Sequence, residues 1–202
     1  MPDVLARYAQ VRVLPPRVAR FQLRALHLAR RLGDDFAWRS ATRPPDVREI
    51  LRLAAGRRTV AELGTATGWT AASLVLDDPE RRVLTFDPVE QQHRAAYLAL
   101  LPETASARIA LHAMPGDEGA AAAAGAGVDF LFIDSTHSRE GTVAEVQAWR
   151  PVLAENALIV LHDYGNPSFP GVAEAVADLG LGGDVRGGCF VIATGASTAA
   201  FG

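Results

Sequence analysis

A glycine turn and the acid that follows it have the clearest chemical potential in this sequence. Gly64 and Gly68 stand in the run Val60-Ala-Glu-Leu-Gly-Thr-Ala-Thr-Gly-Trp69, and Asp87 follows Gly64 by 23 residues. The run indicates a strand, a tight turn at Gly64 where a β-carbon would clash with a ligand, and a helix. The start of that helix offers unpaired N–H groups, and Asp87 could accept hydrogen bonds from two ribose hydroxyls. The pattern predicts a site for an adenosine-bearing cofactor.

The glycine spacing indicates which adenosine cofactor fits. A dinucleotide fingerprint has glycines at its first, third and sixth positions, but here Ala66 and Trp69 follow Gly64 at those positions. This argues against a nicotinamide dehydrogenase. The acid-x-Gly-x-x-x-Gly pattern instead resembles motif I of class I S-adenosylmethionine-dependent methyltransferases, whose cofactor has no pyrophosphate. The resemblance implies that Glu62 orients the loop and the methionine end of the cofactor, and that Asp87 holds the ribose.

Acids and histidines follow the later predicted strands. Asp134 and His137 come after the fourth strand, and His162 and Asp163 come after the fifth. The carboxyl ends of parallel strands meet at one edge of a sheet, where ligands bind. An imidazole with an unperturbed pKa of about 6.5 can take a proton from an alcohol or phenol at neutral pH. The sequence therefore predicts a proton-transfer site with His137 and Asp134 as its catalytic residues.

Two further segments indicate a more specific group of methyltransferases. The runs Phe132-Ile-Asp-Ser-Thr-His137 and Leu161-His-Asp163 resemble small-molecule O-methyltransferases of the catechol and macrolide-sugar type, and the likeness covers roughly residues 45–195. It implies metal-ligand positions at Asp134, His162 and Asp163, and a general base at His137. The cofactor-binding residues that the resemblance implies are Glu62, Gly64, Thr65, Gly68, Asp87, Gly116, Asp117 and Asp134.

The nature of the metal, and its presence, stay open at this stage. Two carboxylates with water suit Mg²⁺. His162, however, stands where the metal-dependent relatives carry an acid, and imidazole shifts the preference towards Mn²⁺, Fe²⁺ or Zn²⁺. The histidine is equally consistent with loss of the metal. Simpler structural roles are also open: Asp134 could cap the helix at 140–150 or bond Ser135, and Asp163 could stabilise a turn.

The expected elements alternate in the way that builds a parallel sheet. Strands are expected at 59–63, 82–86, 108–112, 128–133 and 157–161, with helices near 69–77, 90–101, 117–125, 140–150 and 171–179. We predict an α/β, Rossmann-like, doubly wound, mostly parallel seven-stranded sheet. A C-terminal antiparallel hairpin around Gly187-Gly188, with an unusually short first strand, is expected to complete it. The N-terminus is predicted to hold a helix at 17–32, a loop at 40–46 and a helix from Val47.

Composition limits the function classes. The 202 residues are enough for one compact domain, divided into an arginine-rich helical arm, 1–45, and a cofactor-binding part, 46–202. The chain has no lysine, as is typical of a GC-rich bacterial genome, which excludes a lysine Schiff base or a P-loop clamp. A single cysteine, Cys189, and the lack of any 18-residue apolar run predict a cytoplasmic protein with no membrane partner.

Charge is divided unevenly along the chain. Residues 1–60 hold 13 arginines and five acids, whereas residues 61–202 hold seven arginines and 18 acids. The N-terminal arginines recur opposite apolar residues, as in an amphipathic helix that could dock on the acidic part or on a second subunit, so a homodimer is reasonable. Nucleic acid is an unfavoured partner, because the net charge is −3 and there is no Asn-Pro-Pro-Tyr motif.

The sequence therefore favours O-methylation of a small-molecule hydroxyl by S-adenosylmethionine, assisted by Mg²⁺ or Mn²⁺ if the metal is kept. Two alternatives stay open. One is a nucleic-acid methyltransferase or binding module that uses the basic arm. The other is a catalytically inactive, cofactor-binding partner subunit.

Overall fold

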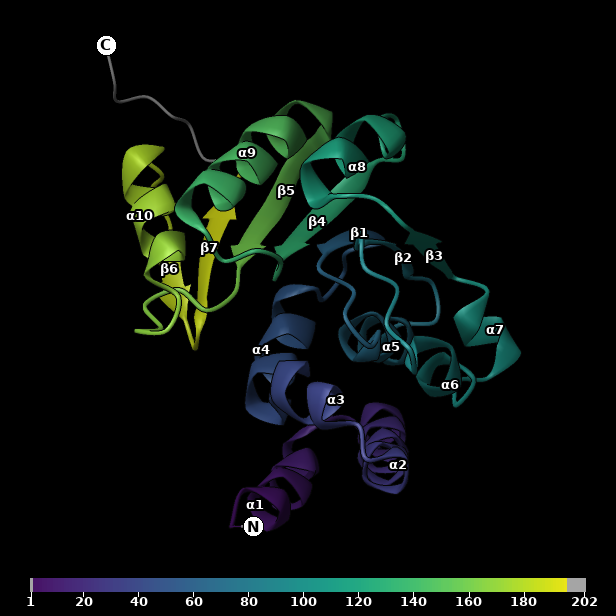
Figure 1. The fold of residues 1–202 in the computed structure, drawn as a ribbon. Coiled ribbons are helices and arrows are strands. Elements are labelled where there is room, and N and C mark those ends of the chain that lie inside the picture. Colours follow the sequence, from purple (N-terminus) through teal and green to yellow (C-terminus); the bar gives the residue numbers. More distant parts are fainter. Residues whose placement is uncertain (1, 196–202) are drawn as a thin grey trace.

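The computed structural model describes residues 2–195 and contains one seven-stranded sheet (Figure 1). The strands are β1 (Thr59–Leu63), β2 (Arg82–Phe86), β3 (Ile109–His112), β4 (Val128–Ile133), β5 (Leu153–Leu161), β6 (Asp184–Arg186) and β7 (Cys189–Ala193). Their order is β3-β2-β1-β4-β5-β7-β6; β1 to β5 pair in parallel, and β7 is antiparallel to both neighbours. This confirms the predicted Rossmann-like sheet with a C-terminal hairpin. Residues 196–202 of the predicted cofactor-binding part lie outside the described residues.

Side chains alternate between the two faces of the sheet, and each face is covered by helices. On one face, β-strand residues such as Val60 and Phe132 pack with α2 (Pro16–Leu32), α4 (Pro44–Leu53) and α5 (Trp69–Asp77). On the other face, residues such as Leu63 and Leu131 pack with α8, α9 and α10 (Figure 1). The bounds of this second layer are α8 (Gly116–Ala122), α9 (Arg139–Trp149), the short turn η2 (Arg150–Val152) and α10 (Pro170–Asp178).

Two expected elements differ from the structure. The helix expected at 90–101 is shorter in the structure, where α6 spans Arg94–Leu98 and ends before Pro102, and a further short helix, α7 (Glu103–Ser106), follows that proline. Strand β5 begins at Leu153 rather than at 157. Its register shifts between the pairs Val128–Leu153 and Phe130–Leu158, and this irregularity lets the strand start early.

The described residues that precede β1, which are the N-terminal arm and the start of the cofactor-binding part, are mainly helical. They form α1 (Pro2–Gln10), the short turn η1 (Val11–Val13), α2, α3 (Asp35–Ser40) and α4. Gly33 ends α2 in the left-handed conformation, as its position predicts. The loop expected at 40–46 is shorter than predicted, because Pro44 and Pro45 form the first turn of α4, where a missing N–H is tolerated.

The arm packs against the sheet domain. Val18, Phe21 and Leu26 of α2 are buried in the core cluster that also contains Leu74 of α5 and Phe130 of β4. Burial of this apolar face is the main source of helix stability in a protein. Within residues 2–195, none of the helices has the length and apolar character that a bilayer crossing requires.

Candidate active site at the carboxyl edge of the sheet

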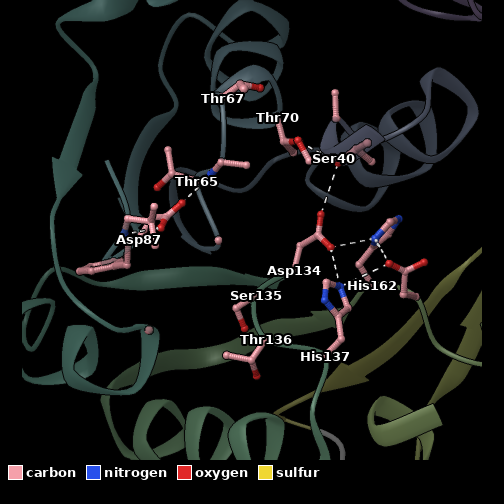
Figure 2. Close-up of a pocket in the computed structure, with 18 of the residues that line it drawn as sticks. Ser40, Thr65, Thr67, Thr70, Asp87, Asp134, Ser135, Thr136, His137 and His162 are labelled. Atoms are coloured by element: carbon pink, nitrogen blue, oxygen red, sulfur yellow. Dashed lines mark hydrogen bonds and ion pairs between the residues drawn. The ribbon is translucent and has the colours of Figure 1, made fainter. Parts of the chain in front are cut away.

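A cavity of about 720 Å³ lies beyond the carboxyl ends of the parallel strands. Its wall is completed by residues of α3 and by the segment that leads into α4. In Figure 2, Asp87 lies at one end of the cavity, and Asp134, His137 and His162 lie at the other. The predicted site residues that line it are Gly64, Thr65, Asp87, Gly116, Asp117, Asp134, His137, His162 and Asp163. Glu62 and Gly68 do not line this cavity.

Contacts within the protein require glycine at the turn after β1. Gly64 has φ +96°, and a β-carbon there would lie 2.2 Å from the carbonyl oxygen of Asp134. We expected a β-carbon at this position to clash with a ligand; in the structure it clashes first with the end of β4. Gly68 has φ +81° and caps α5, where its own β-carbon would press on Leu98. The turn therefore brings β1 and β4 into close contact at the cavity floor.

Asp87 is tied to the glycine turn. Its Oδ2 accepts hydrogen bonds from the N–H of Ala66 at 2.8 Å and from Arg94 at 3.0 Å, and its Oδ1 accepts from the N–H of Val89 at 2.8 Å. A carboxylate has about four acceptor positions. About one therefore remains for a ribose hydroxyl, rather than the two hydrogen bonds expected from the sequence.

Arg94 is a residue of this region that sequence reasoning missed. Its Nε donates to the carbonyl of Ala66 at 2.6 Å, and its Nη2 donates to the carbonyl of Val89 at 2.7 Å as well as to Asp87. The guanidinium thus holds the turn after β1 and the turn after β2 together. An isolated arginine in an ordinary polar stretch carries no sequence signal for this role.

Glu62 lies below the cavity floor and is 1% exposed. Its carboxylate accepts a hydrogen bond from the hydroxyl of Thr85, and that hydroxyl is 2.7 Å from the hydroxyl of Thr65 in the glycine turn. Burial raises the pKa of Glu62 to about 8, although the Thr85 hydrogen bond lowers it. Glu62 thus reaches the loop through Thr85 and Thr65, and it holds its proton at neutral pH.

The raised pKa of Glu62 predicts that the stability of the fold falls as the pH rises from about 4.5 to about 8. The folded protein binds this proton more tightly than the unfolded chain, whose glutamate pKa is about 4.5. The resulting stability is fully present below pH 4.5 and is lost as the pH rises through about 8. The Glu62→Gln variant lacks this titration, so the wild-type free energy of unfolding should fall relative to the variant between pH 5 and pH 8.5. Urea unfolding at several pH values measures the difference. Parallel pH profiles would contradict the prediction, and exposed Glu155→Gln is the control that should follow the wild type.

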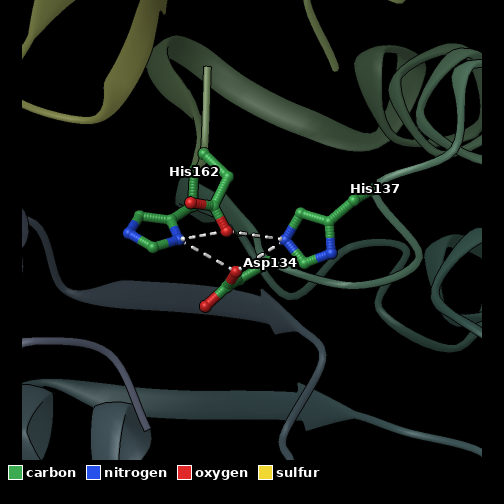
Figure 3. Close-up of side chains that lie close together, drawn as sticks. Asp134, His137 and His162 are labelled. Carbon is green, nitrogen blue, oxygen red and sulfur yellow. Dashed lines mark hydrogen bonds and ion pairs between the residues drawn. The ribbon is translucent and has the colours of Figure 1, made fainter. Parts of the chain in front are cut away.

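Four side chains converge after β4 and β5 to form what we call the quartet: Asp134, His137, His162 and Asp163 (Figure 3). Oδ1 of Asp134 lies 3.0 Å from Nε2 of His137 and 3.0 Å from Nδ1 of His162. Oδ2 of Asp163 lies 3.3 Å and 3.5 Å from the same two nitrogens. Nε2 of His137 and Nδ1 of His162 therefore each face both carboxylates.

The backbone of the quartet is strained. His137 has φ +54° and Asp163 has φ +57°, a region that non-glycine residues rarely adopt. Four non-glycine residues of the described chain have positive φ, and three of them (Ala66, His137 and Asp163) line the cavity. Such strain costs about 1–3 kcal/mol per residue and gathers at functional sites. The strain therefore supports a functional role for this edge of the sheet.

The two carboxylates of the quartet favour the protonated forms of its histidines. Burial alone would raise the pKa of Asp134, but the two imidazoles lower it to about 2. Burial alone would lower the pKa of His137, but hydrogen bonds to Asp134 and Asp163 raise it to about 9. The pKa of His162 is raised and that of Asp163 is lowered for the same reason. With protons alone at the quartet, the two carboxylates favour the protonated form of His137, whereas a general base must be neutral to accept a proton.

The donor atoms of the quartet also fit a divalent metal. All four lie within 4.8 Å of one another, and the N–O separations are 3.0–3.5 Å. Ligands about 2.1 Å from a tetrahedral ion lie about 3.4 Å apart, which is similar. Two imidazole nitrogens and two carboxylate oxygens suit Mn²⁺, Fe²⁺ or Zn²⁺ better than Mg²⁺. The group that could hold an ion thus contains His137 in addition to the three positions that the sequence resemblance implied.

Residues of the segment before α4, of α4 and of α5 surround the quartet. The hydroxyl of Thr42 donates to Oδ2 of Asp134 at 3.4 Å and lies 3.0 Å from the hydroxyl of Thr70. Asp46 Oδ2 lies 3.9 Å from Nε2 of His162. Sequence reasoning missed Thr42 and Asp46, because their approach depends on how α4 packs and leaves no local pattern.

Glu145 is a further cavity residue that the sequence did not reveal. It lies on the buried face of α9, and its carboxylate accepts from the hydroxyl of Ser135 at 2.6 and 2.7 Å. Burial raises its pKa to about 7. Ser138, not Asp134, caps α9, which removes one of the structural alternatives for Asp134. Asp163 also has the turn-stabilising role that was the structural alternative for it. Its Oδ1 accepts a hydrogen bond from Nδ2 of Asn166 at 2.8 Å.

Comparisons with known proteins agree with this fold. The sequence matches the profile of a family described as "Methyltransferase domain" over residues 61–164, more than half of the chain. The structure resembles a putative O-methyltransferase from Klebsiella pneumoniae, with 16% identity, a TM-score of 0.61, and 89% of each chain covered. It also resembles the S-adenosylmethionine complex of the O-methyltransferase TomG from Streptomyces achromogenes, with 18% identity, a TM-score of 0.56 and 70% of each chain covered.

A third similar structure is CalS11, a calicheamicin methyltransferase, with 17% identity, a TM-score of 0.58, and 95% of this chain and 91% of that chain covered. At these identities the structural likeness supports the fold. In the comparison with curated proteins, no sequence matches this chain.

Proposed function

The chain belongs to the methyltransferase-domain family and is an S-adenosylmethionine-dependent methyltransferase, and we propose that it methylates a hydroxyl oxygen of a small molecule. The observation that carries this proposal is the arrangement of one cavity with Asp87 at one end and the quartet at the other. A cavity of about 720 Å³ suits a cofactor and part of an acceptor together.

The cofactor would be held along the glycine turn. We propose that Asp87 binds a ribose hydroxyl with its remaining acceptor position, and that the backbone at Gly64 and Thr65 approaches the methionine part. Gly116 and Asp117, which line the wall after β3, are proposed to border the adenine. Glu62 and Gly68 would act from outside the cavity, Glu62 through Thr85 and Thr65, and Gly68 by starting α5.

The reaction breaks the bond between the methyl carbon and sulfur, whose electrons stay on sulfur, and forms a bond from that carbon to the acceptor oxygen. The hydroxyl proton of the acceptor would pass to water, which a cation at the quartet would favour by lowering the pKa of that hydroxyl. The work of the protein is to align oxygen, carbon and sulfur and to assist loss of that proton. We propose that the acceptor hydroxyl is held beside the quartet, where Thr42 donates a hydrogen bond to Oδ2 of Asp134.

We propose that Asp134, His137, His162 and Asp163 hold a divalent cation of the Mn²⁺ type. Such an ion lowers the pKa of a hydroxyl bound to it. In this proposal His137 is a ligand, and the high pKa that the two carboxylates give it reflects the same preference for positive charge. This differs from the role of a free base that its sequence position suggested.

Calorimetric titration with S-adenosylmethionine, followed by product analysis with catechol, tests the proposal. We expect micromolar binding of the cofactor, and methylated catechol that forms faster with Mn²⁺ than with EDTA. Mn²⁺ at 100 times its Kd should also raise the free energy of unfolding by about 2.7 kcal/mol. Asp163→Asn should abolish that gain, whereas Asp184→Asn, at an exposed site outside the cavity, should retain it.

Three other outcomes would redirect the proposal. Binding and turnover that do not respond to Mn²⁺ would remove the metal from it and leave the methyl transfer. Cofactor binding without turnover of any acceptor would favour an inactive partner subunit. Absence of cofactor binding with and without metal would contradict the proposed function.

A further inference from the structure

We propose that the acceptor carries an anionic group, a carboxylate or a phosphate, which Arg39 and Arg43 bind at the mouth of the cavity. This inference rests on the proposed function, because it concerns the acceptor of the same reaction. It starts from the segment between α3 and α4, whose residues line the cavity although they lie before the matched family domain.

This segment is fixed next to the quartet. Thr42 contacts both Asp134 and Thr70, and Asp46 faces His162. Arg43 is the neighbour of Thr42, so its backbone lies within about 4 Å of the residue that touches the quartet. Arg39 lies on the last turn of α3, and both arginines line the cavity. Both arginines therefore border the cavity that also contains the quartet.

Neither guanidinium is neutralised by the protein. Acids are plentiful in the same cavity, but Asp134 and Asp163 pair with histidines, and Asp87 pairs with Arg94. Within residues 2–195, Arg39 forms no ion pair, and its Nε donates to the carbonyl of Asp35 at 3.3 Å.

Arg43 forms neither an ion pair nor a side-chain hydrogen bond within the same part of the chain, and both arginines are exposed. In contrast, Arg81, Arg94 and Arg108 are held by several protein oxygens each. An arginine that lines a cavity and keeps its donors free can bind a carboxylate or a phosphate with two parallel hydrogen bonds.

Two phenylalanines indicate the shape of the group between the quartet and the arginines. Phe36 of α3 is 41% exposed and Phe169 is 37% exposed, and both line the cavity. The ring of Phe169 stacks on His137 at 4.4 Å between centroids. Exposed aromatic faces beside a reacting centre favour a planar acceptor. The acceptor class that fits is an aromatic hydroxyl compound with an anionic substituent.

Matched acceptors with and without charge test the inference. The probes are 3,4-dihydroxybenzoate and its neutral amide, 3,4-dihydroxybenzamide. We expect the wild type to methylate the benzoate with a kcat/KM about tenfold higher or more, as a charge-assisted hydrogen bond typically provides. The Arg39→Gln/Arg43→Gln double variant should lose this preference through a higher KM for the benzoate, while kcat and the KM for the amide stay nearly unchanged.

Arg48→Gln is the matched control, because Arg48 is an exposed arginine of α4 that does not line the cavity. It should keep the preference of the wild type. Equal kcat/KM values for the two acceptors in the wild type would overturn the inference. It would also be overturned if the double variant weakened S-adenosylmethionine binding instead, because the arginines would then hold the methionine carboxylate of the cofactor.

Binding of the two probes in the presence of S-adenosylhomocysteine separates this inference from the proposed function. Arginine-dependent binding of the benzoate without any methyl transfer would leave the anion site standing and remove the proposed reaction. Methylation of the amide and the benzoate at equal rates would support the proposed reaction and contradict the anion site. Failure of the benzoate to bind at all would overturn the anion site.

Discussion

Replacing Asp134 with asparagine is expected to lower kcat/KM for methyl transfer by about 10³, because the quartet that is proposed to assist loss of the acceptor proton would keep only one of its two carboxylates. Its Oδ1 accepts from both imidazoles of the quartet, and its Oδ2 accepts from Thr42. Asparagine keeps the shape, but it has no charge and only one acceptor oxygen. Either the histidines or Thr42 must then face an N–H₂ group that offers them no acceptor.

The same substitution should change the titration of His137. The pKa of its imidazole is raised to about 9 by hydrogen bonds to Asp134 and Asp163. Removing one carboxylate should move this pKa down towards 6.5, which NMR titration of the ring in EDTA can measure. A pKa that stays near 9 would show that Asp163 alone holds the imidazolium.

Asp129→Asn is the matched control for Asp134→Asn. Asp129 lies near the opposite end of β4, outside the cavity, where its carboxylate accepts from the N–H groups of Arg58 and Thr59 at 2.9–3.1 Å. Its variant should lose stability but keep its kcat/KM per folded molecule. Comparable losses of activity in both variants, or less than a threefold loss in Asp134→Asn, would contradict a role of the quartet at the reacting end.

Much of the fold could be predicted because its signals are local. The alternation of apolar runs and helical patterns gave the bounds of β1, β2 and β4 as they occur in the structure. The misplaced bounds have causes that depend on pairing or on single prolines. Pro102 follows the expected helix at 90–101, of which only Arg94–Leu98 is helical, and the start of β5 depends on an irregular register with β4 that no sequence period encodes.

The candidate site likewise has residues that could be predicted from the sequence and residues that could not. Asp134, His137, His162 and Asp163 could be grouped from the sequence, because the carboxyl ends of parallel strands share one edge. Thr42 could not be added, since it is 92 residues from Asp134 and meets it only through packing of the N-terminal arm. The charge state of His137 was also beyond the sequence, because it depends on two carboxylates reaching one nitrogen.

Replacing Gly64 with alanine is expected to cost about 4 kcal/mol of unfolding free energy and most of the activity of the remaining folded protein. The backbone at Gly64 has φ +96°, which strains any other residue, and the new β-carbon would lie 2.2 Å from the carbonyl oxygen of Asp134. Neither atom belongs to a flexible side chain. The turn after β1 or the end of β4 must therefore move, and the end of β4 carries Asp134.

Gly125→Ala separates the two causes of this loss. Gly125 has φ +77°, but a β-carbon there would meet no atom within 4 Å, so only the backbone strain of about 1–3 kcal/mol applies. Urea unfolding and kcat/KM of both variants make the comparison. A Gly64→Ala protein as stable and as active as Gly125→Ala would show that the end of β4 can yield without disturbing Asp134. The position of that carboxylate would then depend on its contacts with Thr42, His137 and His162 rather than on the glycine turn.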